Sequence, residues 1–209
     1  MELQSDSFDH GGTMPERLAF GIQDDETHIA FGPNRNPHLA WGGLPDGTAS
    51  LALICHDRDV PSKPDDVNQV GRSVPADLPR IDYYHWVLVD IPPGLGEIAE
   101  GAFGEDVVPR GRDTAESPHG TRQGVNDYTS WFAGDADMEG VYTGYDGPCP
   151  PFNDTIPHHY TFTLYALDVD RLDLEDGFTG PDVQQAIEGH VLDSASIMGT
   201  YAINPDVAG

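Results

Sequence analysis

The residues best suited to chemistry stand where apolar strands end. In residues 49–61, a period of two places Leu51, Leu53 and Cys55 on one face, which is typical of a strand with a buried side. Asp57 follows on that face, at the position where a fourth apolar residue would continue the core. The spacing thus puts a carboxylate at the end of a buried face.

Two later segments, residues 82–92 and 158–168, repeat this arrangement. In the first, His85 precedes Val87 and Val89 on one expected face. In the second, two polar residues precede two apolar ones on one face, namely His158 and Tyr160 before Phe162 and Leu164. Three strands therefore each place a titratable or hydroxyl group at the rim of an apolar face.

If these rims meet in space, they form a small polar pocket at the edge of a β core. Imidazolium and phenol groups donate hydrogen bonds, so His85, His158 and Tyr160 would suit a phosphate or a carboxylate. Asp57 would act indirectly, because a nearby carboxylate favours the charged form of a histidine and can orient its ring. The alternative for each residue is a satisfied polar side chain at a strand end, without a ligand.

Metal binding is a second alternative, because the same strands carry donors for zinc or iron: His56, Asp57, Asp59, His85, His158 and His159. Against it, the chain has no HxH or HExxH spacing, and the adjacent histidines 158 and 159 would face opposite ways on a strand. A small metal-dependent or acid/base enzyme that uses His85 and His158 remains the alternative from another functional class. The residues indicate no organic cofactor.

The charge of the chain is one-sided, with 36 acidic residues against 10 basic ones and a formal net charge of -26. Such a field repels nucleic acid and anionic membrane surfaces, so neither is expected as a partner. The first twenty residues lack the basic and apolar regions of a secretory signal, and no run of ~18 apolar residues could span a membrane. We therefore expect a cytoplasmic protein that does not span a membrane, with Cys55 and Cys149 as reduced thiols.

Strand candidates separated by loops dominate the chain, at residues 18–22, 36–41, 49–57, 82–92 and 158–168. Helix signals come late: Pro181 follows Thr179, and apolar residues recur at spacings of three and four from Val183 to Val191. Residues 194–198 are expected to add a helical turn, and residues 201–203 a last short strand. The pattern predicts a mainly β protein, an antiparallel β-sandwich with one appended helix, as a single domain over residues 1–209.

Five motifs stand in a fixed order along the chain: NPHLAW at 36–41, HDRDVP at 56–61, HWV at 85–87, GYDGPCPP at 144–151 and HHY at 158–160. With them the chain resembles the phosphatidylethanolamine-binding proteins, in particular their bacterial and archaeal Raf-kinase-inhibitor-like branch. The first, second and last motifs are similar to that family's N-x-S-P-x-L-x-W, D-P-D-A-P and G-x-H-R-Y. Arg58 and Val60 depart from the second motif, and His159 stands where many members carry arginine.

The resemblance implies an antiparallel sandwich with a large central sheet, a short C-terminal helix and a small anion pocket. It assigns seven residues to that pocket and its border: Asp57, Asp59, His85, Gly147, Pro148, His158 and Tyr160. It also implies a cis peptide bond before Pro61. Residues 101–147 look longer than in bacterial relatives, which indicates an insertion near 108–121 that would cover the pocket or join two copies in a homodimer.

The functional expectation is a non-enzymatic binding protein with a small anionic ligand. The pocket would take a phosphoryl or carboxylate group, as part of a phospholipid head group, a phosphorylated ligand or a modified protein side chain. Members of the family bind phospholipid head groups and inhibit kinases or proteases. A kinase or a protease is therefore the protein partner that the resemblance suggests.

Overall fold

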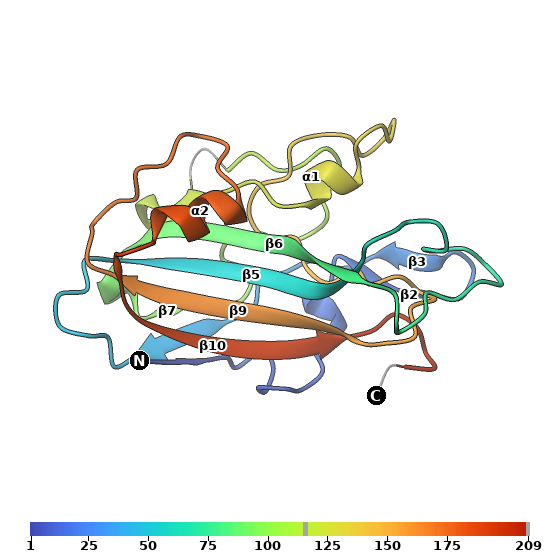
Figure 1. The fold of residues 1–209 in the computed structure, drawn as a ribbon, viewed down its shortest axis with the longest axis horizontal. Helices are drawn as coiled ribbons and strands as arrows, with labels where there is room; N and C mark the ends of the chain where they lie inside the picture. Colours follow the sequence, from blue (N-terminus) through green and yellow to red (C-terminus); the bar gives the residue numbers. More distant parts are fainter. Residues whose placement is uncertain (115–116, 208–209) are drawn as a thin grey trace.

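The computed structural model describes residues 1–114 and 117–207, and its largest element is an antiparallel sheet with the strand order β10-β9-β5-β6-β8 (Figure 1). These strands are β5 (Ser50–Pro61), β6 (Arg80–Ile91), β8 (Arg122–Gln123), β9 (His158–Leu167) and β10 (Val191–Tyr201). A smaller antiparallel sheet has the order β1-β4-β7, with β1 (Glu2–Gln4), β4 (Leu39–Gly42) and β7 (Glu97–Ile98). A separate hairpin joins β2 (Gly21–Asp24) and β3 (His28–Phe31).

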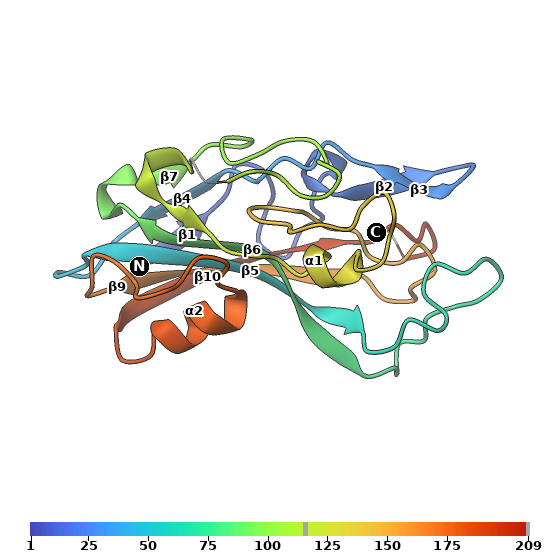
Figure 2. The same cartoon turned by 90° about the horizontal axis from the view of Figure 1, so that it is seen from above.

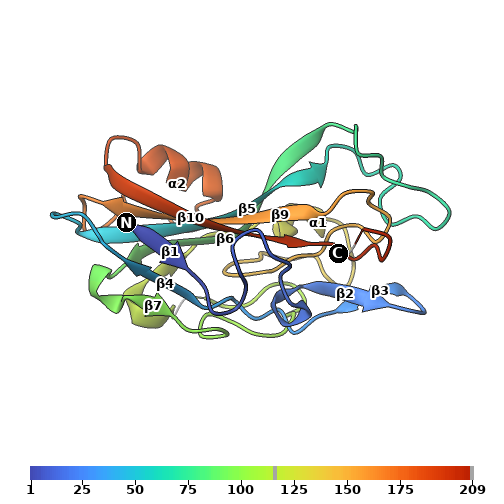
Figure 3. The ribbon, with the colours of Figure 1, turned by 90° about the horizontal axis from the view of Figure 1, so that it is seen from below.

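The large sheet lies between two other layers. Figure 2 shows α2 (Gly180–Ala186) against one face, and the β1-β4-β7 sheet with the β2-β3 hairpin on the other side. Figure 3 shows the same layers from the opposite side, with the far ends of β5 and β6 and the loop between them turned toward the side of α2. The remaining helices are single turns: η1 (Glu16–Leu18), η2 (Pro93–Leu95), η3 (Pro118–Gly120) and α1 (Tyr128–Trp131). The expected mainly β, antiparallel sandwich is confirmed.

Strand β5 is central because both of its faces are apolar. Leu51, Leu53 and Cys55 are buried in the cluster between the two sheets, as their spacing predicts. Ala52 and Ile54 face the other way and are buried in the cluster beneath α2. A strand that buries alternate residues in two clusters has its direction and register strongly fixed.

A β-bulge in β6 corrects the expectation that His85 shares a face with Val87 and Val89. Cys55 pairs with Trp86, whereas the next residue of β5, His56, pairs with Tyr84, so His85 is an extra residue in the ladder. A bulge of this kind bends the strand and redirects a side chain. The two valines lie in the cluster beneath α2, while the His85 ring packs on Tyr160, which lies in the cluster on the opposite face of the sheet.

The C-terminal helix is shorter than the sequence predicts. Thr179 begins it with a capping box, in which its backbone N–H and its hydroxyl donate to the Asp182 carboxylate at 2.8 Å and 2.7 Å. The helix ends at Ala186, and Gly189 adopts a positive φ of 83° that only glycine adopts readily. The apolar residue Val191, expected on the helix, instead starts β10.

The expected helical turn at 194–198 is also wrong, because these residues lie within β10 and pair with β9 from Ser194 opposite Tyr165 onward. The short strand expected at 201–203 is the end of this long strand, which stops at Tyr201. Ile197, Gly199 and Tyr201 are buried and the residues between them are less so, and this period of two is typical of a strand and not of a helix.

Two expectations near the N-terminal half of the chain need correction. The strand expected at 18–22 begins only at Gly21, after the single turn η1. The described residues contain no cis peptide bond, so the one expected before Pro61 is wrong. Val60 and Pro61 pair with Ile81 and Arg80, and this extended backbone continues β5 with trans peptides.

Residues 101–147 are mostly irregular, and residues 115 and 116 of the expected insertion near 108–121 lie outside the described residues. The described part of that segment is held closely: Gly111 has a positive φ of 87°, and a Cβ on it would lie 2.0 Å from the carbonyl oxygen of Val141. Only glycine fits such a contact. Within the part of the chain described, none of the helices is long or apolar enough to cross a lipid bilayer.

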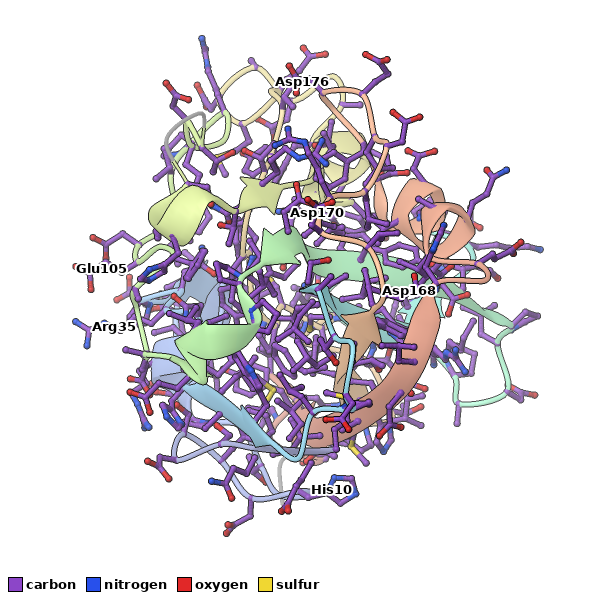
Figure 4. The ribbon with its side chains drawn as sticks, turned by 90° about the vertical axis from the view of Figure 1, so that its left-hand side faces the viewer. His10, Arg35, Glu105, Asp168, Asp170 and Asp176 are labelled. Atoms are coloured by element: carbon purple, nitrogen blue, oxygen red, sulfur yellow. The ribbon has the colours of Figure 1, made fainter. Side chains whose placement is uncertain are left out.

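Acidic residues are exposed at several places on the surface, some of them in ion pairs. Figure 4 shows Asp168, Asp170 and Asp176 along one end of the molecule, from the end of β9 to the loop before α2. On the same view Arg35 and Glu105 form an exposed ion pair at 3.2 Å. Exposed pairs of this kind contribute little to stability.

Candidate functional site

A cleft of about 530 Å³ opens at the far ends of β5, β6 and β9. Four of the expected site residues line it together: Asp57, His85, His158 and Tyr160. Strand pairing brings these residues together, because Asp57 pairs with Tyr160 on one side and with Tyr83 on the other. The bulge in β6 then brings His85 to the same side of the sheet.

His158 is the centre of a buried chain of charges. Its Nδ1 donates to Asp57 Oδ2 at 2.6 Å, and its Nε2 donates to Asp154 Oδ2 at 3.1 Å. Arg80 then holds Asp154 with two hydrogen bonds of 2.6 Å and 3.0 Å. Burial opposes a charge on the ring, but the two carboxylates outweigh it and raise the pKa of His158 to about 9.

Because each ring nitrogen of His158 already forms a hydrogen bond with a carboxylate, His158 cannot donate to a ligand. Both ring nitrogens are occupied by carboxylates, so this imidazolium serves to neutralise Asp57 and to fix its position. The sequence-based idea that Asp57 keeps a histidine charged agrees with this geometry. The idea that this same histidine donates directly to an anion does not.

His85 has the opposite character. Its ring is 3% exposed, and its Nδ1 lies 2.8 Å from the carbonyl oxygen of Asp146. A carbonyl oxygen only accepts, so Nδ1 carries the proton and Nε2 of the neutral ring presents a lone pair. Nε2 is buried and has no hydrogen-bond partner within the described residues. Burial lowers the pKa of His85 to about 4 despite the nearby Asp57.

Aromatic rings surround His85 on three sides. Its centroid lies 5.0 Å from that of Tyr83, 5.7 Å from that of Tyr128 and 5.1 Å from that of Tyr160. Burial raises the pKa of Tyr160 well above its ordinary value, so its hydroxyl keeps its proton and can donate to a ligand. The floor of the cleft thus combines an unpaired acceptor with a protonated phenol.

The walls and the mouth of the cleft are apolar. Phe20 stacks on Tyr128 at 4.2 Å and packs beside Phe132, and all three line the cleft. At the mouth, Trp131 and Ile81 are 47% and 49% exposed. An aromatic wall that leads to a small polar floor fits a ligand with a polar head and an apolar body.

Apart from the His158 imidazolium, which is already paired with two carboxylates, the charged residues that line the cleft among the described residues are acidic. Asp82 and Asp127 join Asp57 in the lining, which includes no lysine or arginine in the described part of the chain. Asp127 accepts the backbone N–H of Tyr84 at 2.7 Å, and burial raises its pKa. A dianion would therefore enter this cleft against both the local and the overall charge.

Three of the expected site residues lie beside the cleft and do not line it. The Asp59 carboxylate binds the backbone N–H and Nδ1 of His159, and the Asp59 backbone N–H donates to Asp57 Oδ1 at 2.7 Å. Gly147 and Pro148 use their backbone groups within the protein, with the Gly147 carbonyl accepting the Tyr128 hydroxyl at 2.8 Å. No residue that the structure describes in the segment 108–121 lines the cleft.

The metal donors that the sequence offers do not converge. His56 faces away from the cleft, where its Nε2 accepts from Arg58 at 2.9 Å, and the exposed His159 is bound to Asp59. Among the described residues, no group of three or more His, Cys, Asp or Glu side chains is arranged to hold a metal ion.

Several residues in or behind the cleft have no signal in the sequence. Arg80 and Asp154 hold the charge chain from positions that read as loop ends, and Tyr83 reads as an ordinary strand aromatic. Asp127 and Trp131 come from a segment without periodicity. The only available hint was the length of that irregular segment, since long loops without regular structure are often functional.

The comparisons with known proteins agree over nearly the whole chain. Residues 4–202 match the family model described as "Phosphatidylethanolamine-binding protein". A UPF0098 protein of Methanothermobacter thermautotrophicus is 35% identical over 201 residues, which cover 96% of this chain and 98% of the relative. The UPF0098 protein YbhB of Escherichia coli is 31% identical over 97% of this chain and 100% of its own. Among solved structures, Escherichia coli YbcL, titled as a new member of the mammalian PEBP family, has a TM-score of 0.65 at 25% identity and covers 96% of this chain and 97% of its own.

Proposed function

Because this chain belongs to the phosphatidylethanolamine-binding protein family, we propose that it is a non-enzymatic binding protein whose cleft holds a phosphoryl or carboxyl group. Residues 1–209 would act as one domain, since the cleft draws on positions from Phe20 to Tyr160. The observation that carries the proposal is the buried Nε2 of His85, which has no hydrogen-bond partner among the described residues, in a residue that lines the cleft. A buried polar atom without a partner is costly, so a ligand that pairs with it gains affinity.

The tautomer of His85 decides the protonation state of the bound group. The neutral ring accepts at Nε2, so an oxygen of the ligand must bring a proton, or the ring must take one up as the anion arrives. Both routes end in the same complex, in which one proton lies between Nε2 and the ligand oxygen. Binding is therefore coupled to the uptake of a proton that the free anion lacks.

The rest of the ligand would lie on the aromatic wall. Phe20, Tyr128 and Phe132 continue the cleft from the floor toward Trp131 at the mouth. A phosphate monoester with an aromatic or alkyl body would fill both parts. The same chemistry occurs in a lipid head group and in a phosphorylated or acidic side chain of a partner protein such as a kinase or a protease.

The test is calorimetric titration with inorganic phosphate and phenyl phosphate between about pH 5.5 and 8, in two buffers that differ in ionisation enthalpy. We expect affinity to fall by up to tenfold per pH unit toward pH 8, with uptake of a proton on binding. Phenyl phosphate should bind more tightly than phosphate, because only the ester reaches the aromatic wall. Phosphoethanolamine and a phosphotyrosine peptide then distinguish a head group from a protein side chain as the source.

The matched variants are His85→Gln and His190→Gln. His190 is exposed, is bound to Asp168 at 2.8 Å and does not line the cleft, so its loss should leave binding unchanged. His85→Gln can donate its amide N–H to the dianion and therefore needs no added proton, so binding should weaken and lose its pH dependence. If the wild type binds neither phosphate nor phenyl phosphate at any of these pH values, or if His85→Gln binds as the wild type does, the proposal is wrong.

A further inference from the structure

A second buried carboxylate stands directly behind His85. Asp146 is 2% exposed, and its two carboxylate oxygens accept from the side-chain amides of Asn34 and Asn126, each at 2.8 Å. The guanidinium of Arg112 lies 3.8 Å from the same carboxylate. None of these four residues lines the cleft, so the cluster has no direct contact with a ligand there.

Asp146 binds His85 through both of its backbone polar groups. The Asp146 carbonyl accepts from His85 Nδ1 at 2.8 Å, and the Asp146 N–H donates to the His85 carbonyl at 3.1 Å. The first bond selects the tautomer, because it requires the proton on Nδ1. The position of one carbonyl group therefore decides which atom His85 presents to the cleft.

Asn34 can present only its NH₂ group to Asp146. Its Oδ1 already accepts the backbone N–H of Gly147 at 2.8 Å, and its Nδ2 also donates to the Asp106 carbonyl at 3.2 Å. A flip of the amide would break both bonds, because it would turn the amide NH₂ toward the Gly147 N–H and the amide oxygen toward the Asp106 carbonyl. The orientation of this amide is thus set by the backbone on either side.

Asn126 is fixed in the same way. Its Oδ1 accepts the backbone N–H of Tyr128 at 3.1 Å, and its Nδ2 donates to the Gly144 carbonyl at 3.0 Å. Two amide donors therefore converge on position 146, and they need two acceptors there. Among side chains of this size, only a carboxylate offers an acceptor to each of them, whereas an asparagine would turn its own NH₂ against one.

We propose that Asp146 is a positioning residue of the cleft: its carboxylate, held by Asn34 and Asn126, fixes the carbonyl that keeps the His85 Nε2 lone pair directed at the ligand. The binding arm of this inference rests on the proposed function, but the tautomer of His85 does not. Asp146 acts through His85 and touches no ligand itself.

Arg112 connects Asp146 and its two asparagine partners to the segment 108–121. Its guanidinium donates to the carbonyls of Glu105 and Asp106 at 3.3 Å and 2.8 Å while it faces Asp146. The segment thus supports the back of the site and leaves the mouth of the cleft to other residues. Burial raises the pKa of Asp146 to about 6, although the amide donors and Arg112 oppose the shift.

The test compares Asp146→Asn with Asp90→Asn. Asp90 is also a carboxylate with little exposure, held by Arg122 at 2.6 Å and by the backbone N–H of Leu172 at 3.1 Å, but it does not line the cleft or contact His85. Both variants should lose stability. Only Asp146→Asn should change the ¹⁵N chemical shifts of His85 from the Nδ1–H tautomer toward a mixture, and weaken phenyl phosphate binding by about tenfold or more.

An exchange variant protects the test against a folding defect. Asn126→Asp with Asp146→Asn keeps one carboxylate and one amide at the contact, and gives up the bond to the Gly144 carbonyl and the ion pair between position 146 and Arg112. We expect it to fold and to restore the Nδ1–H tautomer. The inference is overturned if Asp146→Asn leaves the His85 tautomer as in the wild type, if Asp90→Asn shifts it equally, or if the exchange variant does not fold.

The two proposals can fail separately. If the wild type binds no phosphate or phenyl phosphate, the proposed function is wrong, while the ¹⁵N shifts of His85 still decide the role of Asp146. If the wild type binds and Asp146→Asn binds equally well with an unchanged tautomer, only the positioning role is wrong.

Discussion

The charge chain around His158 gives the protein a stability that depends on pH in the neutral to alkaline range. In the folded state, Asp57 and Asp154 hold the imidazolium through both ring nitrogens. In the unfolded chain the ring has its ordinary pKa of 6.5. The perturbation we consider is a rise in pH from 6.5 to 8.5 in the wild type and in Asp57→Asn.

The sign and the size follow from proton linkage. The folded-state pKa of about 9 lies above the unfolded value, so the stability from this proton is complete below pH 6.5 and is lost as the pH rises through about 9. Integration from pH 6.5 to 8.5 gives a loss of about 2 kcal/mol in the free energy of unfolding. The window ends at pH 8.5 because unfolded thiols ionise near 9, whereas burial raises the pKa of the Cys149 thiol to about 12.

The assay is urea unfolding at half-unit steps of pH, followed by tryptophan fluorescence. Asp57→Asn removes the carboxylate that raises the pKa of His158 most, so the slope should fall to half or less. Asp59→Asn is the matched control, because its pair with His159 is exposed and should leave the slope unchanged. A flat wild-type profile between pH 6.5 and 8.5, or an unchanged slope in Asp57→Asn, would refute the reasoning.

Two further outcomes are expected. Arg80→Met should destabilise the protein by about 3 kcal/mol, because it leaves the buried Asp154 without its bidentate partner, whereas Arg58→Met, at an exposed position, should change the urea midpoint very little. On the acid side, the lowered pKa of His85 means that stability is lost as the pH falls below 6.5 toward 4, so from pH 6.5 to 5 the wild type should lose roughly 1.5 kcal/mol more than His85→Gln. The raised pKa of Asp146 acts in the opposite direction below pH 6 in both proteins and cancels in their difference. An equal change in both proteins would contradict the assignment of His85.

The alternation of apolar residues in the sequence predicts most of the large sheet. The period of two in β5 and β9 predicts which side chains share a face, and the ladder confirms it from Leu51 to Cys55 and from Tyr160 to Leu164. The pattern works here because β5 buries both of its faces and β9 buries the face that carries Tyr160, Phe162 and Leu164. Alternation is weaker toward the C-terminus, and there the predicted helix after Thr179 is longer than the observed one, which ends at Ala186.

The arrangement of the site could not be read in the same way. A bulge is a single unpaired residue, and nothing in the neighbourhood of His85 distinguishes it from a regular strand position. The donors to Asp146 come from positions 34, 112 and 126, and their convergence depends on how three irregular segments fold onto one another. Local patterns predict such residues as turns and loops, because their partners are distant in sequence.

The charges of the site also explain why a proton belongs to the proposed complex. At pH 7 the Asp57 and Asp154 carboxylates are balanced by the His158 imidazolium and the Arg80 guanidinium, so the charge chain has no net charge. His85 is neutral beside it, and the formal charge of the whole chain is -26. A dianion bound alone would add two negative charges to a cleft whose other charged lining residues are acidic, whereas a monoanion that shares a proton with His85 adds one. The low polarity around His85 lowers the pKa of the ring when no ligand is bound. It also strengthens a hydrogen bond from an acidic O–H to the ring, and so favours the protonated form of the ligand.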